Sequence, residues 1–402
     1  MSTDQTADPA AVATRAFLVA HHDELVAFRR HLHAYPELSN VEHETTDFVV
    51  QRLEAAGLAP RVLPTGTGLV CDIGTGDGPV VALRADLDAL AMEDEADVPY
   101  RSKRPGIAHA CGHDVHTTVV LGAGLALATQ LAGRAGRVRL LFEPAEESLP
   151  AGANTVIASG GLDDVVAVYG LHCDPKLDVG TIGVRPGPLT AATDLVRLDL
   201  HGPGGHTARP QLTVDLVRLA GRLATELPPL VRAGASPLGD ALFVWGALHT
   251  GDAPNVIPAR AHLAGTFRTP DREVWAAADR LVADAVATIV EGTGATFVLD
   301  HQRGVPPVVN DETETDRLAS MARGVVGEAA VIEAPRSLGG DSFAWYLADV
   351  PGTYARLGVH DPAWGDERGD LHSSTFDVHE GAIDIGIEVL VATALDALRA
   401  HG

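Results

Sequence analysis

The chain has 402 residues, more than one hydrophobic core usually accommodates, so we expect two domains. A hydrophobic content of 46% with mixed charges predicts a folded globular protein, and the net charge of −24 argues against nucleic acid or an anionic membrane as a partner. No apolar run approaches the roughly 20 residues of a membrane span, and residues 1–12 lack the apolar segment of a signal peptide.

Cysteine usage predicts the compartment. The three cysteines are too few for a disulfide framework. We interpret Cys71 and Cys173 as buried free thiols, and Cys111 lies in a motif described below. Free thiols are typical of a reducing environment, so we expect a cytoplasmic protein.

The first part of the chain predicts alternating helices and strands. Apolar residues at helical spacing predict helices over about 16–30 and 42–56. Short apolar runs predict buried strands at 69–73, 80–84, 138–142 and 166–171. A longer run rich in alanine, leucine and glycine predicts a buried helix at 115–131, between the second and third strands. Such alternation predicts an α/β layered domain.

The sequence pattern changes near Pro186. Polar–apolar alternation predicts strands at 192–201, 241–250 and 259–267. Helical spacing predicts helices at 214–227 and 272–291, so the order is strand, helix, strand, strand, helix. This order predicts a small α+β domain with an antiparallel sheet over 190–302. After Pro306 helices and strands return, ending in a helix over about 381–400. Because His372 is needed for the site below, we expect a discontinuous first domain, 1–189 and 303–402, into which the second is inserted.

The most informative stretch is His-Ala-Cys-Gly-His-Asp-Val-His at 109–116, which places one thiol and three imidazoles within eight residues. Further candidate ligands follow in Glu-Pro-Ala-Glu-Glu at 143–147, Gly-Leu-His at 170–172 and Leu-His-Ser-Ser at 371–374. Thiolate, imidazole and carboxylate bind zinc and related divalent metals. Together these clusters predict a metal site, although each histidine alone would more often be structural or exposed.

Paired carboxylates indicate that the site handles water. Adjacent Glu146 and Glu147 repel each other when buried unless a cation offsets them. One can then bind the metal while the other serves as a general base toward water. Asp86 and Asp88 follow a predicted strand, where α/β sheets bind ligands. They either touch a metal or orient a ligating histidine, or they are solvated turn residues.

A glycine-rich loop, Gly-Pro-Gly-Gly-His at 202–206, lies in the second domain. Such a loop lets the backbone approach a ligand closely. His206 could therefore donate a hydrogen bond to a developing oxyanion, unless the segment is a plain turn with an exposed histidine.

These residues together resemble the M20 family of metallo-amidohydrolases and peptidases. The likeness is greatest to its subfamily D of N-acyl-amino-acid, hippurate and auxin-conjugate hydrolases. It covers nearly the whole chain in the family's order, through the motifs at 28–39, 83–90, 109–117, 142–147, 205–206, 255–258 and 265–268. The chain departs from the family's pattern in three places. Gln211 stands where a histidine is frequent, Asp341-Ser342-Phe343 replaces Glu-Asp-Phe, and Ser373 replaces the proline that commonly follows the last ligand.

The resemblance implies a site for two divalent metal ions, zinc or manganese with cobalt as a further option, held by Cys111, His113, Glu147, His172 and His372. Glu146 would be the general base and acid. His206 would stabilise the oxyanion, and in this family it often comes from the partner subunit of a dimer. The residues that would contact the substrate are Asn255, Arg268 and the glycine loop at Gly340. The inserted domain would be the lid and dimerisation domain of a homodimer.

The expected function is metal-dependent hydrolysis of the amide bond of N-acyl amino acids, giving a carboxylic acid and a free amino acid. One alternative is a metallo-carboxypeptidase or dipeptidase on the same scaffold. Another is a catalytically inactive metal-binding homologue. The retention of Glu146 beside Glu147 argues against the inactive protein, because a structural metal site needs no free base.

Overall fold

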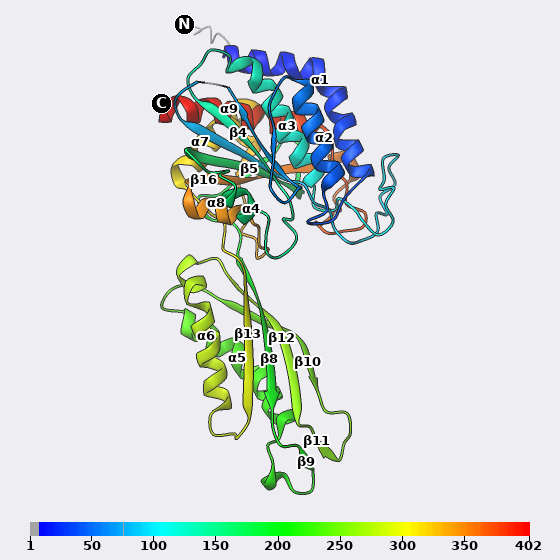
Figure 1. The fold of residues 1–402 in the computed structure, drawn as a ribbon, viewed down its shortest axis with the longest axis vertical. Coiled ribbons are helices and arrows are strands. Elements are labelled where there is room, and N and C mark those ends of the chain that lie inside the picture. Colours follow the sequence, from blue (N-terminus) through cyan, green and yellow to red (C-terminus); the bar gives the residue numbers. More distant parts are fainter. Residues whose placement is uncertain (1–7, 75) are drawn as a thin grey trace. The chain divides into compact units, whose positions relative to one another are not determined.

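The computed structural model describes residues 8–74 and 76–402 (Figure 1). No signal peptide is expected in residues 1–12, and residues 1–7 of this segment lie outside the described residues. The chain divides into two compact units. Unit 1 comprises Met1–Gly187, Val309–Pro335 and Trp345–Gly402, and unit 2 comprises Pro188–Val308 and Arg336–Ala344.

Unit 2 is longer than the expected 190–302 at its C-terminal side. The segment Arg336–Ala344 belongs to it because it is hydrogen-bonded to the start of the unit. The Ser337 N–H donates to Leu189 O at 2.9 Å, and the Ala191 N–H donates to Gly339 O at 3.0 Å. These contacts join residues far apart in sequence, so local patterns do not predict them.

Unit 1 is built on an eight-stranded sheet in the order β1-β2-β4-β3-β5-β16-β6-β15. Its strands are β1 Arg61–Val62, β2 Leu69–Ile73, β3 Val80–Asp86, β4 Arg137–Glu143, β5 Val165–Asp178, β6 Ile182–Val184, β15 Val331–Glu333 and β16 Gly352–His360. Strands β4, β3, β5 and β16 run parallel. This is the α/β class that the alternation of helices and strands predicts.

Helices surround this sheet. They are α1 Pro9–Ala34, α2 His43–Ala55, α3 His113–Gln130, α4 Ala153–Ala158, α7 Glu312–Val326, α8 Phe343–Asp349 and α9 Gly381–His401. Short 3₁₀ turns occur at Glu328–Ala330 and Pro362–Trp364. Two further short strands, β7 Gly187–Pro188 and β14 Val309–Asn310, pair with each other. Helices α3 and α9 pack on each other and on β3, and α1 packs on both (Figure 1). Every residue of α3 from His113 to Leu127 is buried, which explains its lack of a polar face.

Unit 2 is an antiparallel sheet in the order β10-β12-β8-β13, with two helices (Figure 1). Its elements are β8 Ala192–His201, β9 Gly205–His206, a 3₁₀ turn Pro210–Leu212, α5 Leu216–Ala235, β10 Leu242–Thr250, β11 Val256–Ile257, β12 Arg260–Thr269, α6 Arg272–Val290 and β13 Thr296–Val305. Alternate residues of β8 are buried beneath α5 and α6, as the alternation predicts.

Two features of unit 2 differ from the sequence-based expectation. Helix α5 continues past Pro228 and Pro229 to Ala235, although proline lacks the N–H that a helix interior uses. Burial of Val231 and Ala235 in the core stabilises the helix beyond the two prolines. Strand β13 is not predicted, because polar residues interrupt its apolar pattern; its pairing with β8 defines it.

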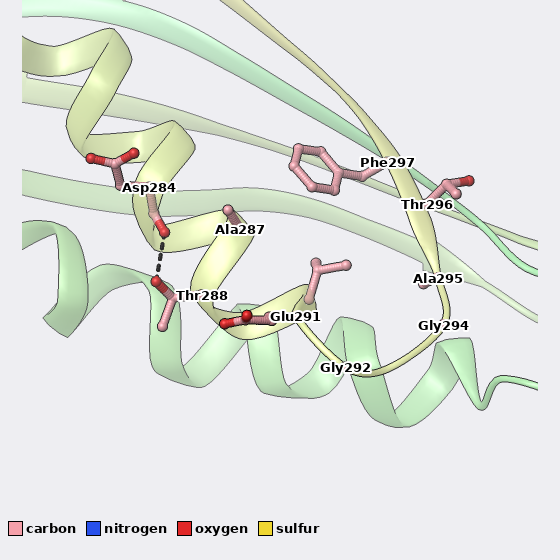
Figure 2. Close-up of a pocket in the computed structure, with 10 residues that line it drawn as sticks. Asp284, Ala287, Thr288, Glu291, Gly292, Gly294, Ala295, Thr296 and Phe297 are labelled. Carbon is pink, nitrogen blue, oxygen red and sulfur yellow. Dashed lines mark hydrogen bonds between the residues drawn. The ribbon is translucent and has the colours of Figure 1, made fainter.

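A shallow groove of about 790 Å³ lies beside the turn from α6 to β13 (Figure 2). Gly292 and Gly294 form this turn with positive φ angles, and the Thr288 hydroxyl donates to Asp284 O at 2.7 Å. Of the ten described residues that line the groove, only Asp284 and Glu291 are ionisable. The groove therefore lacks the convergent polar groups of a reaction site.

None of the helices among residues 8–74 and 76–402 combines the length and the apolar composition that crossing a membrane requires.

The core of unit 2 generates a stability prediction. Leu223 on α5 is 0% exposed, so Leu223→Ala should lower the free energy of unfolding by about 2–5 kcal/mol. Val217 on the same helix is 51% exposed, so Val217→Ala should change it by less than about 0.5 kcal/mol. Urea unfolding followed by circular dichroism measures both. Equal losses in the two variants would contradict this account of the core.

Candidate metal centre

The carboxyl ends of two parallel strands in unit 1 bring acidic residues to the site. Asp86 ends β3 and Glu143 ends β4. The register Arg84↔Gly170 between β3 and β5 puts Asp86 level with His172. Ligands of α/β sheets bind at this edge. The expectation that the strand ends near His172 is wrong, because β5 continues to Asp178 through pairing with β16.

A left-handed glycine starts α3 beside this edge. Gly112 is the residue before the helix and has φ 91°, and the helix begins at His113 rather than near Val115. A Cβ on Gly112 would lie 2.8 Å from Cβ and Sγ of Cys173, so a side chain does not fit. This turn directs Cys111 and His113 into the same cluster.

Among the described residues, four groups could each hold a cation, because within each group the potential ligand atoms lie within 4.8 Å of one another. The groups are Cys111, His113 and His172; Asp86, His113 and His116; Cys111, Glu147 and His372; and His113, Glu146 and Glu147. All five ligands implied by the family resemblance occur in them, and so does the proposed base Glu146.

Hydrogen bonds orient two of the imidazoles. His113 Nδ1 lies 2.8 Å from Asp88 O, and His172 Nδ1 lies 2.7 Å from Cys173 O. A carbonyl only accepts, so each ring donates from Nδ1, which leaves Nε2 as the nitrogen available to a cation. His172 Nε2 lies 3.6 Å from Cys111 Sγ, which places an imidazole lone pair beside the thiol. Both rings thus present a metal-binding nitrogen to the cluster.

His116 has a different role from the neighbouring histidine. Its Nδ1 lies 2.7 Å from Asp86 Oδ1, and its Nε2 accepts the Cys173 N–H at 2.8 Å. Both ring nitrogens are therefore used within the protein. His116 links the end of β3 to β5 instead of offering a ligand.

His372 reaches the cluster from the C-terminal part of unit 1. Its backbone has φ 59°, a left-handed conformation that is uncommon for residues other than glycine. The His372 N–H donates to Ala110 O at 2.7 Å, which ties this loop to the segment carrying Cys111. His372 Nε2 lies 3.2 Å from Glu147 Oε1. Such strain persists only where the surroundings enforce it, as they do at functional sites.

The donor set fits a divalent cation. His113 Nε2 is buried and has no hydrogen-bond partner among the described residues. An unsatisfied buried polar group costs about 1–3 kcal/mol, which a bound cation would remove. Burial raises the pKa of the Cys111 thiol above its usual range, so a cation is needed to favour the thiolate.

Charges around the two histidines act in opposite directions. Burial, with His116 and Arg356 nearby, lowers the pKa of His172 well below its usual value, which keeps the ring neutral. Burial also opposes charge on His113, but Asp86 and Cys111 raise its pKa well above the usual value. A cation at His113 would take the place of that proton, as metal binding does at imidazole ligands.

Unit 2 brings together His206 and Asn255. Strand β9 pairs with β11 through His206↔Val256, and the Thr207 N–H donates to Asn255 O at 3.3 Å. The Ala208 N–H donates to His206 Nδ1 at 3.0 Å. The proton of the neutral ring is therefore on Nε2, and the exposed imidazole is a hydrogen-bond donor.

Unit 2 also brings together Arg268 and the glycine loop. Arg268 Nη1 donates to Leu338 O and, at 3.1 Å, to Thr193 Oγ1. A Cβ on Gly340 would lie 2.9 Å from the same Thr193 hydroxyl. Among the described residues, Arg268 has no carboxylate partner, and burial lowers its pKa. A guanidinium with only neutral acceptors is ready to bind an anion.

Two residues at the site were not foreseen. Arg84 is 1% exposed, and its Nε lies 2.7 Å from Glu143 Oε2 while its Nη1 lies 2.5 Å from Asp86 Oδ2. An arginine directly after the apolar run at 80–83 is a signal that could have indicated it. The Ser39 hydroxyl donates to Asp88 Oδ2 at 2.6 Å, and no local pattern indicates that contact.

The site predicts that cation binding depends on Cys111. Cys111→Ala removes the ligand shared by two of the four groups, so tight binding of zinc should fall by at least about tenfold. Cys71→Ala, a buried thiol on β2, is the matched control and should bind normally. Equilibrium dialysis with metal analysis measures both. Unchanged binding in Cys111→Ala would remove this residue from the ligand set.

Comparisons with known proteins identify the family of the chain. Residues 82–396 match Peptidase family M20/M25/M40. The chain is 40% identical over 365 residues to N-acetyl-L-cysteine deacetylase of Bacillus subtilis (strain 168), covering 90% of this chain and 85% of that protein. It is also 44% identical over 369 residues, 92% of this chain, to a Rhodococcus jostii (strain RHA1) protein named as a glutamate--cysteine ligase, but it spans only 46% of that longer protein.

A solved structure extends the likeness to the fold. The YXEP protein of Bacillus subtilis, described as a dinuclear metal binding peptidase from M20 family, superposes with a TM-score of 0.82 at 32% identity. The match covers 95% of this chain and 99% of that one. On the family match and these relatives, the chain belongs to peptidase family M20/M25/M40, whose members hydrolyse amide bonds.

Proposed function

We propose that this protein hydrolyses the amide bond of N-acyl amino acids that carry a free carboxylate. Water is consumed, and the products are a carboxylic acid and a free amino acid. The observation that carries the proposal is the placement of Glu146, whose carboxylate lies within 4.8 Å of potential ligand atoms of His113 and Glu147. A second carboxylate beside a cation site is suited to act as a base toward water.

Two divalent ions would be held by Cys111, His113, Glu147, His172 and His372, with zinc or manganese as the expected metal and cobalt as a further option. When bound, such ions polarise the amide carbonyl and lower the pKa of water from about 15.7 toward about 7. Cys111 belongs both to the group with His113 and His172 and to the group with Glu147 and His372, which supports two neighbouring positions.

Glu146 moves the proton in the proposed reaction. Its carboxylate accepts the proton of the attacking water and later donates it to the leaving amine. The C–N bond breaks, the C–O bond forms, and no other proton carrier is needed. One residue thus serves as base and then as acid.

His206 would stabilise the oxyanion. Its exposed ring carries the proton on Nε2, because Nδ1 accepts the Ala208 N–H. Removal of one oxyanion donor typically lowers the rate by about 100–1000-fold. We propose that His206 acts on the active site of the partner subunit in a homodimer, and that unit 2 is the lid and dimerisation domain.

Arg268 would bind the carboxylate of the substrate. Its guanidinium lacks a carboxylate partner among the described residues, so an incoming carboxylate would balance its charge. The backbone near Gly340 and the side chain of Asn255 would complete the contacts. The free thiols Cys71, Cys111 and Cys173 suit a reducing cytoplasm, where we place the reaction.

N-acetyl-L-cysteine is the first substrate to test. A relative at 40% identity is named for its deacetylation. A panel should therefore contain N-acetyl-L-cysteine, N-acetyl, N-benzoyl and indole-acetyl derivatives of other amino acids, and dipeptides. The enzyme is loaded with zinc or manganese, and chelated enzyme is the control. We expect metal-dependent release of amine from acylated amino acids.

Other outcomes identify the alternatives. Cleavage of dipeptides alone would favour the carboxypeptidase or dipeptidase, which the description of the YXEP protein as a peptidase makes the second candidate. Binding of two metal ions without cleavage of any compound would favour the inactive homologue.

The role of Glu146 generates a further prediction. Glu146→Gln keeps the shape of the side chain but cannot accept a proton, so kcat should fall by at least about 100-fold. Metal content, measured by elemental analysis, should stay at the wild-type value. Glu54→Gln, an exposed residue on α2, is the control. Substantial activity in Glu146→Gln would show that another group is the base.

A further inference from the structure

Glu42 is a buried carboxylate that the proposed reaction does not use. It lies just before α2 and is 0% exposed. Its side chain does not cap this helix; the Thr45 N–H near the helix start donates instead to Glu37 Oε2 at 2.7 Å. Glu42 Oε1 accepts the N–H of Ala145 at 2.7 Å and the N–H of Asn40 at 2.9 Å. The carboxylate thus connects the start of α2 to the residue before Glu146.

The backbone that Glu42 holds is strained. Ala145 has φ 54° and Asn40 has φ 68°, a left-handed conformation that few residues other than glycine adopt. Such a conformation persists when surrounding contacts enforce it. The buried bond from the Ala145 N–H to Glu42 is a contact of this kind, because it holds the residue that immediately precedes Glu146.

A second carboxylate fixes the other side of Glu146. The Glu147 N–H donates to Asp88 Oδ2 at 2.9 Å. The N–H of each residue that flanks the proposed base is therefore bound by a carboxylate from a distant part of unit 1. Pro144, which precedes this pair, has no N–H to contribute. The position of the Glu146 backbone thus depends on Glu42 and Asp88.

From this geometry we infer that Glu42 is a positioning residue, which acts through Ala145 to hold Glu146 where it can take the proton from water. The inference rests on the proposed function for its effect on rate, but the hydrogen bond itself can be tested without activity. Displacement of a reacting group by about 1 Å can cost about 100-fold in rate.

The experiment compares four variants with wild-type enzyme. Glu42→Ala removes the acceptor of the Ala145 N–H. Glu42→Asp keeps a carboxylate but shortens the side chain by one methylene, which moves the acceptor oxygen away from that N–H. Glu42→Gln keeps an acceptor oxygen at the same reach. Glu44→Ala is the matched control, because Glu44 lies in the first turn of the same helix with its side chain 74% exposed.

Two readouts are measured on metal-loaded enzyme of known metal content. Hydrogen exchange of peptides covering residues 144–149 should speed up in Glu42→Ala and Glu42→Asp, but not in Glu42→Gln or Glu44→Ala. In the same two variants kcat should fall by about 10–100-fold, with KM changed by less than about threefold and metal content unchanged. Glu42→Gln should retain most of the wild-type kcat.

The possible failures are distinguishable. Wild-type kcat in Glu42→Asp and Glu42→Ala would overturn the inference, and so would loss of metal in proportion to loss of rate. A Glu42→Gln variant as impaired as Glu42→Ala would do the same. If Glu42→Ala does not fold, Glu42→Asp and Glu42→Gln decide the outcome. If wild-type enzyme cleaves nothing in the panel, the proposed function fails, while unchanged exchange in Glu42→Asp would separately exclude the Glu42 contact.

Discussion

The burial of charge at the carboxyl edge of β3 is the constraint on which the rest of the structure depends. Asp86 and Asp88 are at most 1% exposed, and Arg84, His113 and His116 lie against them. Burying a charge without a partner costs several kcal/mol. The end of β3 and the start of α3 are therefore held in one arrangement, since each supplies a group that balances these carboxylates, and the Cys173 N–H on β5 holds His116 in place.

Three positive φ angles occur in the segments that meet at this edge, at Gly112, Ala145 and His372. Each is held by a contact from elsewhere: the close approach of Cys173 at Gly112, the Glu42 carboxylate at Ala145, and the Ala110 carbonyl at His372. These contacts thus hold potential ligand atoms close together. Preorganisation of this kind reduces the cost of bringing the ligands together on binding.

The proposed chemistry divides between the two units. Unit 1 holds the metal-binding groups and Glu146, whereas unit 2 offers a hydrogen-bond donor, His206, and a guanidinium without a carboxylate partner, Arg268. Each unit has a hydrophobic core of its own. The residues around the candidate metal site in unit 1 therefore do not depend on the packing inside unit 2.

The sequence by itself determined the α/β class, the antiparallel sheet of unit 2 and the residue types of the metal site, because these follow from periodicity and from ligand chemistry. Only the tertiary structure decided that His113 presents a free nitrogen while His116 is used up by Asp86 and Cys173. Both are histidines three residues apart in one helix. Neighbours on β3 and β5 assign their roles, and contacts between distant segments, like that of Glu42 with Ala145, leave no local pattern in the sequence.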